Sequence, residues 1–433
     1  MSTLFRDARL ADGRTRGLRT HSGASVAVDA AGDPDPTDRV VGADRRLLLP
    51  GAIDARVHFR DPGDAHKESW ATGSRSAAAG GVTTVVDQPN TTPPTITGGA
   101  FDRKAELAAA STVDYGINGG VTGDWAPDSL FDRPAVALGE VFLADSTGGM
   151  GIDTDRFAAA VERAAAAGVV VTVHAEDATR FDETARDRDA GGTGRDADAA
   201  RWSEYRPAAA EVAAVEDAVS IGAAAGATVH IAHTSTPGGV DAAIDAGATC
   251  EATPHHLLLS RDDATELGTY GRMNPPLRSQ TRREGLWDRL RDGTIDIVAT
   301  DHAPHTAAEK ETGLWDAPSG VPGVETMLPL LLERARRGAI SYERVRDVTA
   351  ANVAAVFDLP RKGRIAEGND PDLVLIDPER SREIRGADLH SKCGWTPFEG
   401  MDGVFPSLTM VRGTVVYENG AFPSGPVGAN VRS

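Results

Sequence analysis

The chain is poor in cysteine and in aromatic residues. It contains two cysteines among 433 residues, Cys250 and Cys393, and phenylalanine, tyrosine and tryptophan together make up 5%. Two cysteines this far apart in the sequence provide neither a disulfide framework nor a thiolate metal cluster. Any metal ion in this protein must therefore be held by histidine and carboxylate side chains.

Long apolar runs are also missing from the sequence. No stretch offers the roughly 20 consecutive apolar residues that a membrane-spanning helix needs. Residues 1–7 lack the charged lead and the following apolar segment of a secretory signal. We therefore expect a cytoplasmic protein without a membrane partner.

Positive charge is scarce as well. The chain has 45 basic and 64 acidic residues, which give a net charge of −19, and only five of the basic residues are lysine. Such an excess of negative charge argues against nucleic acid as a partner. It favours an acidic, halophilic-type surface that stays soluble at high salt, where screening removes much of the self-repulsion. The alternative is an ordinary acidic protein from a GC-rich genome.

Short β-prone segments occupy both ends of the chain. Residues 25–28 and 46–49 read as strands near the start, and residues 373–376, 408–411 and 414–417 read as strands near the end. Glycine, aspartate and proline turns separate these segments. We expect one small β-sandwich domain, assembled from residues 1–49 and 366–433.

Between these ends, over residues 50–365, β-rich runs alternate with alanine-rich amphipathic segments. The runs at 81–87, 169–174 and 295–301 are typical of buried parallel strands, and the segments between them are typical of crossover helices. This alternation predicts an α/β fold with a (β/α)8 TIM barrel as the catalytic domain. A polar stretch at residues 182–201 is predicted to be a surface loop near the barrel mouth.

Polar residues follow several of these apolar runs, at the ends where barrel enzymes place their active sites. They are His58, Arg60, Asn90, His174, Glu176, His233, Asp301, His302 and His305. A single histidine at a strand end is usually structural. Several strands that end in this way indicate a shared metal site.

The chemistry of these side chains limits the kinds of reaction that the site can support. Imidazole and carboxylate ligands without thiolate suit zinc, manganese or iron, and a bound water in such a site can have a pKa near about 7. Arg60 and His305 are expected to add positive charge at the same end of the barrel, and a guanidinium there suits bidentate binding of a carboxylate. The sequence therefore predicts a hydrolytic or cyclising enzyme whose partner is a small anionic molecule with an amide-like bond.

Nine segments resemble the dihydroorotase family of the amidohydrolase superfamily in both order and spacing. They are residues 50–63, 88–91, 173–177, 230–236, 254–257, 274–278, 299–305, 320–326 and 392–399. The resemblance implies reversible cyclisation of N-carbamoyl-L-aspartate to L-dihydroorotate, a step in pyrimidine (UMP) biosynthesis. It also implies Zn2+ as the cofactor, with one or two ions per chain.

The resemblance assigns roles to individual residues. The metal ligands that we expect are His58, Glu140, His174, His233 and Asp301. Asp301 is also the expected catalytic residue, which moves the proton between the attacking water and the substrate. The expected substrate-binding residues are Arg60, Asn90, Asn274 and His305, with the backbone of Pro322 and Gly323 beside the ring. For His255 and His256 we expect either a structural role or a role in supporting the metal ligands.

Two positions depart from the family pattern. Arg56 stands where the family has the first of two metal-binding histidines, and a guanidinium has no lone pair for a cation. Glu140 stands where many relatives carry a carboxylated lysine that bridges two metals. One hypothesis is that Arg56 lies near Glu140 and replaces the charge of one metal, which leaves a single zinc on His174, His233 and a carboxylate. The other keeps two metals bridged by Glu140, with Arg56 turned toward Asp54 or the substrate.

Two other functions stay open at this point. A hydantoinase, dihydropyrimidinase or allantoinase shares the barrel and its histidines, although Arg60 and residues 274–278 and 392–399 favour dihydroorotase. A non-catalytic homologue that acts as a binding partner in an assembly of pyrimidine enzymes would also lose metal ligands, although this chain retains Asp301, Asn90 and Asn274. For the assembly of the chain, a homodimer stays open as one alternative.

Overall fold

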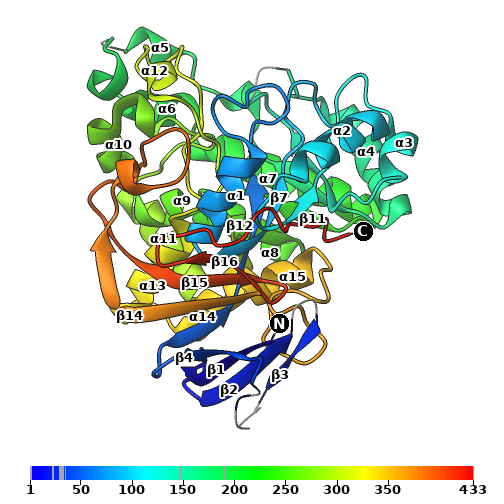
Figure 1. The fold of residues 1–433 in the computed structure, drawn as a ribbon. Helices are drawn as coiled ribbons and strands as arrows, with labels where there is room; N and C mark the ends of the chain where they lie inside the picture. The colour runs from blue at the N-terminus through cyan, green and yellow to red at the C-terminus, as the bar shows by residue number, and fades with distance from the viewer. Residues whose placement is uncertain are drawn as a thin grey trace.

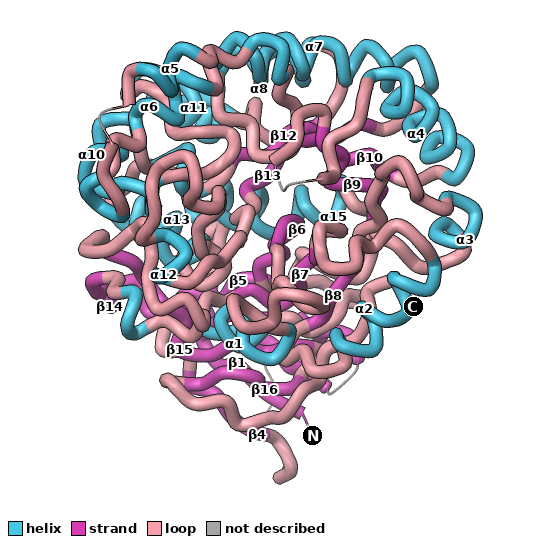
Figure 2. Tube along the Cα trace, turned by 90° about the horizontal axis from the view of Figure 1, so that it is seen from above, coloured by secondary structure: helices cyan, strands magenta, loops and turns pink. Residues whose placement is uncertain are grey.

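Eight parallel strands form the barrel in a computed structural model that describes residues 2–21, 24–28, 34, 36–146, 149–189 and 191–432. They are β6 (Ala52–Val57), β7 (Val82–Asp87), β8 (Asp114–Ile117), β9 (Ala137–Phe142), β10 (Val170–His174), β11 (Val229–Ile231), β12 (Thr249–Ala252) and β13 (Ile297–Val298). Neighbouring strands pair in chain order from β6 through β7 to β8 and from β9 through to β13. The parallel bridges Gly119–Leu138 and Val57–His302 join these two sheets and close the ring. The predicted (β/α)8 barrel is confirmed (Figure 2).

Helices surround the barrel because its strands need cover on their outer side. Every residue of β7 is buried, as a parallel strand between a packed interior and an outer helix layer requires. The longer outer helices are α1 (Trp70–Ala79), α2 (Gly98–Ala108), α4 (Thr154–Ala167), α7 (Ala208–Ala225), α8 (Pro237–Asp245), α11 (Gln280–Asp292) and α13 (Met327–Arg336). Shorter ones are α3 (Pro127–Phe131), α9 (Pro254–Leu258), α10 (Arg261–Leu267), α12 (Ala307–Lys310), α14 (Tyr342–Arg346) and α15 (Asn352–Val356).

The polar stretch at residues 182–201 is more ordered than a surface loop. It contains the helix α5 (Thr184–Asp187) and leads into α6 (Ala200–Tyr205). Its polar side chains bond to one another, since the Thr184 hydroxyl and the Arg188 guanidinium both donate to Asp182. Local hydrogen bonds of this kind replace the apolar burial that the composition lacks. The stretch lies at the upper end of the molecule beside α12 (Figure 1).

Both ends of the chain contribute to one eight-stranded sheet. Its order is β16-β15-β14-β5-β1-β2-β3, with β4 paired to β1. The strands are β1 (Ser2–Arg9), β2 (Thr15–His21), β3 (Ala24–Val28), β4 (Arg39–Gly42), β5 (Leu47–Pro50), β14 (Leu373–Glu383), β15 (Asp402–Val411) and β16 (Thr414–Glu418). Buried side chains of both halves, such as Phe5 and Met410, share a single core. The expected assembly of both termini into one small β-domain is confirmed, and its strands form a single sheet.

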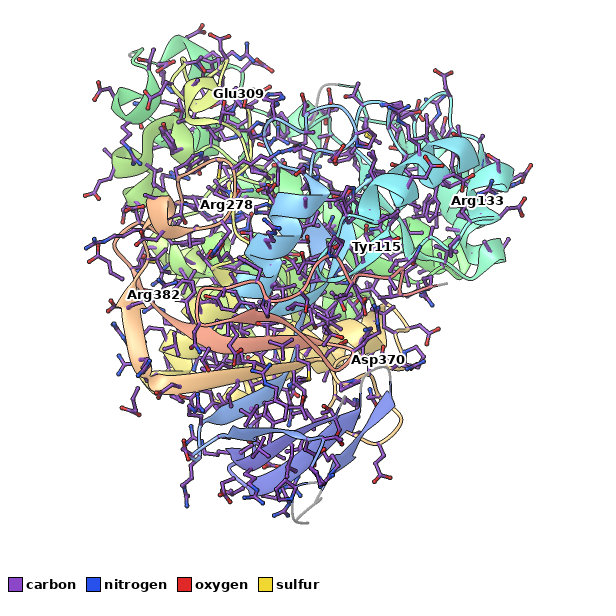
Figure 3. The ribbon with its side chains drawn as sticks, in the orientation of Figure 1. Tyr115, Arg133, Arg278, Glu309, Asp370 and Arg382 are labelled. Carbon is purple, nitrogen blue, oxygen red and sulfur yellow. The ribbon has the colours of Figure 1, made fainter. Side chains whose placement is uncertain are left out.

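A buried ion cluster ties this sheet to the barrel. The Lys362 ammonium lies 2.6 Å from Asp114 on β8, 3.0 Å from Asp370 and 2.7 Å from Asp372. Figure 3 places Asp370 between the barrel and the small sheet. Beyond β16 the chain returns to the barrel, where the amide of Val431 donates to a carbonyl of β8. The strands of residues 366–433 thus belong to the small sheet, whereas the final segment packs on the barrel.

None of the described helices is both long enough and apolar enough to cross a membrane.

Candidate active site

A cavity of about 660 Å³ opens at the carboxyl ends of the barrel strands. It is lined by all five expected metal ligands and by the expected substrate-binding side chains, namely His58, Arg60, Asn90, Glu140, His174, His233, Asn274, Asp301 and His305. Because these residues lie in or after seven different strands, the parallel barrel is what brings them together.

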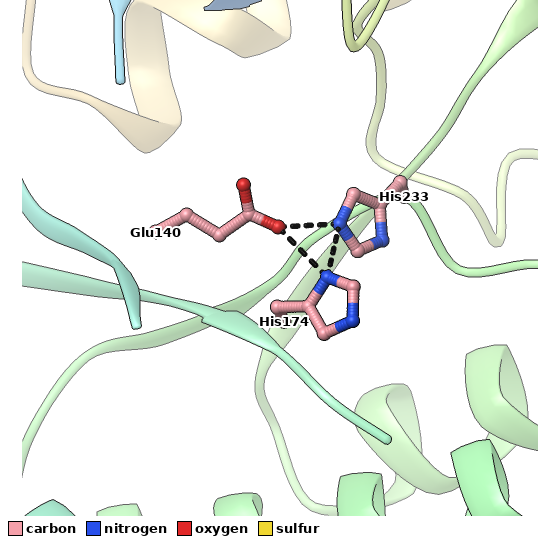
Figure 4. Close-up of side chains that lie close together, drawn as sticks. All are labelled: Glu140, His174 and His233. Carbon is pink, nitrogen blue, oxygen red and sulfur yellow. Dashed lines mark hydrogen bonds and ion pairs between the residues drawn. The ribbon is translucent and has the colours of Figure 1, made fainter. Parts of the chain in front are cut away.

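Glu140, His174 and His233 form the tightest group in this cavity. The Glu140 Oε1 atom lies 3.0 Å from His174 Nδ1 and 2.5 Å from His233 Nε2, and these two nitrogens are 3.0 Å apart. Figure 4 shows the carboxylate facing both rings. All three side chains are buried. One carboxylate oxygen and two imidazole nitrogens that converge on one point match the ligand types of zinc.

A second layer of charges orients His174. Its Nε2 atom lies 3.0 Å from Glu176, and Glu176 in turn accepts hydrogen bonds from Arg206. Although burial disfavours the imidazolium, the hydrogen bonds to Glu140 and Glu176 raise the pKa of His174 to about 9. A metal ion at Nδ1 would therefore displace a proton. Carboxylate support of this kind fixes the ring and makes the ligand more basic.

His58 and Asp301 form a second group that shares Glu140. The His58 Nε2 atom lies 2.9 Å from Asp301 and 3.9 Å from Glu140, and its Nδ1 atom lies 2.6 Å from the Asn90 side-chain oxygen. Burial opposes ionisation of Asp301, but the hydrogen bond and the charge of His58 hold the pKa of Asp301 below its usual range. Asn90 therefore orients His58 in addition to lining the cavity.

Arg56 is fully buried and lies between two carboxylates. Its Nη1 atom is 3.2 Å from Glu140 Oε2, and its Nε atom donates to Glu251. Burial alone would lower the pKa of Arg56, but the charges of Glu251 and Glu140 raise it. The contact with Glu140 is the one that the single-metal hypothesis expects. Asp54 accepts a hydrogen bond from the Arg56 backbone and not from its guanidinium.

Arg60 and His305 lie together on the wall of the cavity. The Arg60 Nη2 atom is 3.2 Å from His305 Nε2. Burial and the neighbouring Arg60 charge hold the pKa of His305 well below its usual range, so this imidazole is neutral and does not carry the positive charge expected from the sequence. A guanidinium beside a neutral imidazole in a buried wall is suited to an anionic ligand.

The remaining expected residues lie in two different places. Asn274 lines the cavity, but Pro322 and Gly323 are absent from its lining, where Ser319 and Gly320 stand instead. The amide of Gly323 donates to the ring of His302, which is buried and does not line the cavity. Pro322 and Gly323 therefore do not line this cavity, and their place beside the ring stays a prediction.

His255 and His256 are buried, as expected for structural histidines. His256 bonds to the Pro275 carbonyl at 2.9 Å and to the Thr253 hydroxyl. Burial lowers the pKa of His255 to about 4, so this ring is neutral. Neither histidine lines the cavity.

Three of the site residues adopt left-handed backbone conformations. The φ angles are 60° at Arg60, 31° at His233 and 49° at Asp301. Non-glycine residues in such conformations cost about 1–3 kcal/mol each, and they persist where the surrounding structure holds them. Strain at three residues of one cavity is typical of a functional site.

Comparison with known proteins agrees with this geometry. The amidohydrolase family is matched by residues 47–416. The chain is 66% identical to the dihydroorotase of Halobacterium salinarum, over 99% of both proteins. It is 43% identical to the dihydroorotase of Methanosarcina mazei, over 88% of this chain and 86% of that protein. The solved L-hydantoinase (dihydropyrimidinase) from Arthrobacter aurescens has a TM-score of 0.92 and 30% identity, and the match covers 99% of each chain. The chain therefore belongs to the amidohydrolase family.

Proposed function

We propose that this protein is a zinc-dependent dihydroorotase, which interconverts N-carbamoyl-L-aspartate and L-dihydroorotate in the cytoplasm. The observation that carries the proposal is the pairing of two kinds of group in one cavity. Histidines and carboxylates suited to a metal face an Arg60–His305 wall suited to a substrate carboxylate. The archaeal relatives named dihydroorotase support the same substrate.

Different residues of the cavity bind the substrate and transfer the proton. Arg60, with Asn90, Asn274 and His305 nearby, binds the carboxylate and the polar edge of the ring. Asp301 accepts a proton from the attacking water and delivers it to the ring nitrogen as the C–N bond breaks. Ring closure runs these steps in reverse. Zinc, when bound, polarises the carbonyl and lowers the pKa of water.

Charge balance favours one zinc ion per chain, held by Glu140, His174 and His233. Glu140, Glu251 and Asp301 bring three negative charges to this part of the barrel, and Arg56 provides one positive charge. The two negative charges that remain equal the charge of one Zn2+. A second ion at His58 and Asp301 would lie beside the Arg56 guanidinium, which repels it.

A direct assay tests the proposed function. The purified chain, supplied with zinc at high salt, is expected to hydrolyse L-dihydroorotate, with a fall in ultraviolet absorbance as the ring opens. A chelator should abolish the activity, and added zinc should restore it. Hydrolysis of hydantoin or allantoin in place of dihydroorotate would indicate the other cyclic amidohydrolases. Failure with all three ring substrates would favour the non-catalytic homologue.

The net charge of −19 leads to a prediction about salt. Raising the KCl concentration from about 0.1 M to about 1 M shortens the screening length from about 10 Å to about 3 Å. We expect the thermal unfolding midpoint, measured by circular dichroism, to rise by several degrees, because self-repulsion of the folded surface weakens. NaCl at equal ionic strength should act alike. A midpoint that does not change with salt would contradict a halophilic-type surface.

A further inference from the structure

The helix α6, which follows the polar stretch at residues 182–201, places Trp202 in the wall of the cavity. Trp202 lies on α6, is 4% exposed and lines the same cavity as Asn274. Its indole Nε1 atom donates to the Asn274 Oδ1 atom at 2.9 Å and to the Met273 carbonyl at 3.1 Å. An indole N–H can only donate a hydrogen bond. The oxygen of the Asn274 amide must therefore face Trp202.

The nitrogen of the same amide points the other way. Asn274 Nδ2 donates to the Ser146 hydroxyl at 2.7 Å. An amide nitrogen carries two hydrogens, and in the part of the chain that the structure describes Ser146 is its only acceptor. The second hydrogen is available to a ligand in the cavity.

Neighbouring side chains keep Trp202 from turning. The guanidinium carbon of Arg272 lies 3.9 Å from the centre of its ring, and Arg272 also donates to the carbonyls of Leu314 and Ala317. The ring of Trp315 lies 5.6 Å away. A rotated indole would break both the stacking on Arg272 and the hydrogen bond to Asn274.

We propose that Trp202 is a positioning residue that fixes Asn274 as a hydrogen-bond donor, so that the substrate must present an oxygen atom at this point. The inference rests on the proposed function, in which Asn274 binds substrate. A carboxylate or carbonyl oxygen of a cyclic ureide satisfies the free N–H. A ring N–H at the same place would face another donor, and both groups would stay unpaired.

The substitution Trp202→Phe tests this role, because it removes the indole N–H and retains an aromatic ring. We expect KM for dihydroorotate to rise about tenfold, the effect of one hydrogen bond of about 1.4 kcal/mol. The value of kcat should change less than about threefold, because the proton transfer at Asp301 is untouched. Asn274→Asp should raise KM further, since it replaces the donor with a negatively charged acceptor.

Trp315→Phe is the matched control. Its indole N–H donates to Asp189 at 2.7 Å, and Trp315 does not line the cavity. Phenylalanine retains the aromatic ring that packs against Trp202, so KM should stay at the wild-type value in this variant. An unchanged KM in Trp202→Phe would overturn the proposal, as would an equal rise in both variants, which would point to aromatic packing.

A binding measurement separates this inference from the proposed function. Isothermal titration with succinate, a simple dicarboxylate, gives Kd without turnover. We expect weaker binding by Trp202→Phe and unchanged binding by Trp315→Phe. If the wild-type protein binds succinate with this pattern but does not hydrolyse dihydroorotate, the positioning role stands and the proposed function fails. Equal succinate affinities in all three proteins would refute the positioning role.

Discussion

Asp301→Asn is expected to lower kcat for dihydroorotate hydrolysis by about 10²–10⁴-fold, the usual contribution of a general acid–base group. The amide is close in shape to the carboxylate, but it cannot accept the proton from water or return it to the ring nitrogen. Asp301 lies 2.9 Å from His58 and outside the group of Glu140, His174 and His233. The zinc content, measured by mass spectrometry, should therefore stay at the wild-type value while turnover falls.

Asp316→Asn provides a matched control, because Asp316 lines the same cavity and the change removes the same charge. Asp316 is not among the residues grouped around Glu140. Its turnover should stay within a few-fold of wild type. Near-normal turnover in Asp301→Asn would remove Asp301 from the mechanism. Loss of zinc from that variant would instead assign Asp301 to metal binding.

Much of the site could be predicted from the sequence because a parallel barrel fixes where strand ends meet. Apolar β-rich runs end at or just before four of the site residues, namely His58, His174, His233 and Asp301. This pattern of apolar runs is visible in the sequence without coordinates. The carboxyl ends of such strands converge in any barrel of this kind. The alternation of strands and helices therefore predicted both the fold and the convergence of these side chains.

The contacts that the sequence left undetermined depend on side-chain direction. Glu251 lies on β12 and binds Arg56, yet an acid within a buried run gives no sign of its partner. The Pro322–Gly323 segment matches the family pattern but does not line the cavity, whereas Ser319 and Gly320 do. The role of Trp202 was not predicted, because this residue follows a polar stretch that was predicted to be a loop. Its role depends on a hydrogen bond to Asn274, 72 residues away.

Arg56→Met is expected to destabilise the folded protein by about 3–5 kcal/mol, because it leaves buried carboxylates without their cation. The guanidinium is fully buried, lies 3.2 Å from Glu140 and also binds Glu251. Methionine fills similar volume without charge. Urea denaturation of the zinc-loaded protein, followed by circular dichroism, measures the loss as a lower midpoint.

Arg133→Met is the control for this substitution. Arg133, which Figure 3 labels at the periphery of the molecule, pairs with Asp102 at 2.7 Å, and the two side chains are 35% and 50% exposed. Solvent screens such a pair, so its loss should change the midpoint far less than the loss of Arg56. Equal effects of the two substitutions would mean that Arg56 does not compensate the buried carboxylates.

Arg56→His asks whether the guanidinium takes the place of a second metal ion. The wild-type chain should bind one zinc ion, because the Arg56 guanidinium forms an ion pair with Glu140 Oε2 and a second metal ion would have to displace it. An imidazole at position 56 removes this charge and adds a ligand near the group of His58, Glu140 and Asp301. The variant should therefore bind two zinc ions per chain, counted by mass spectrometry after dialysis. Two ions in the fully active wild-type protein would show that Arg56 does not exclude the second metal, and the charge balance around Glu140 would need another explanation.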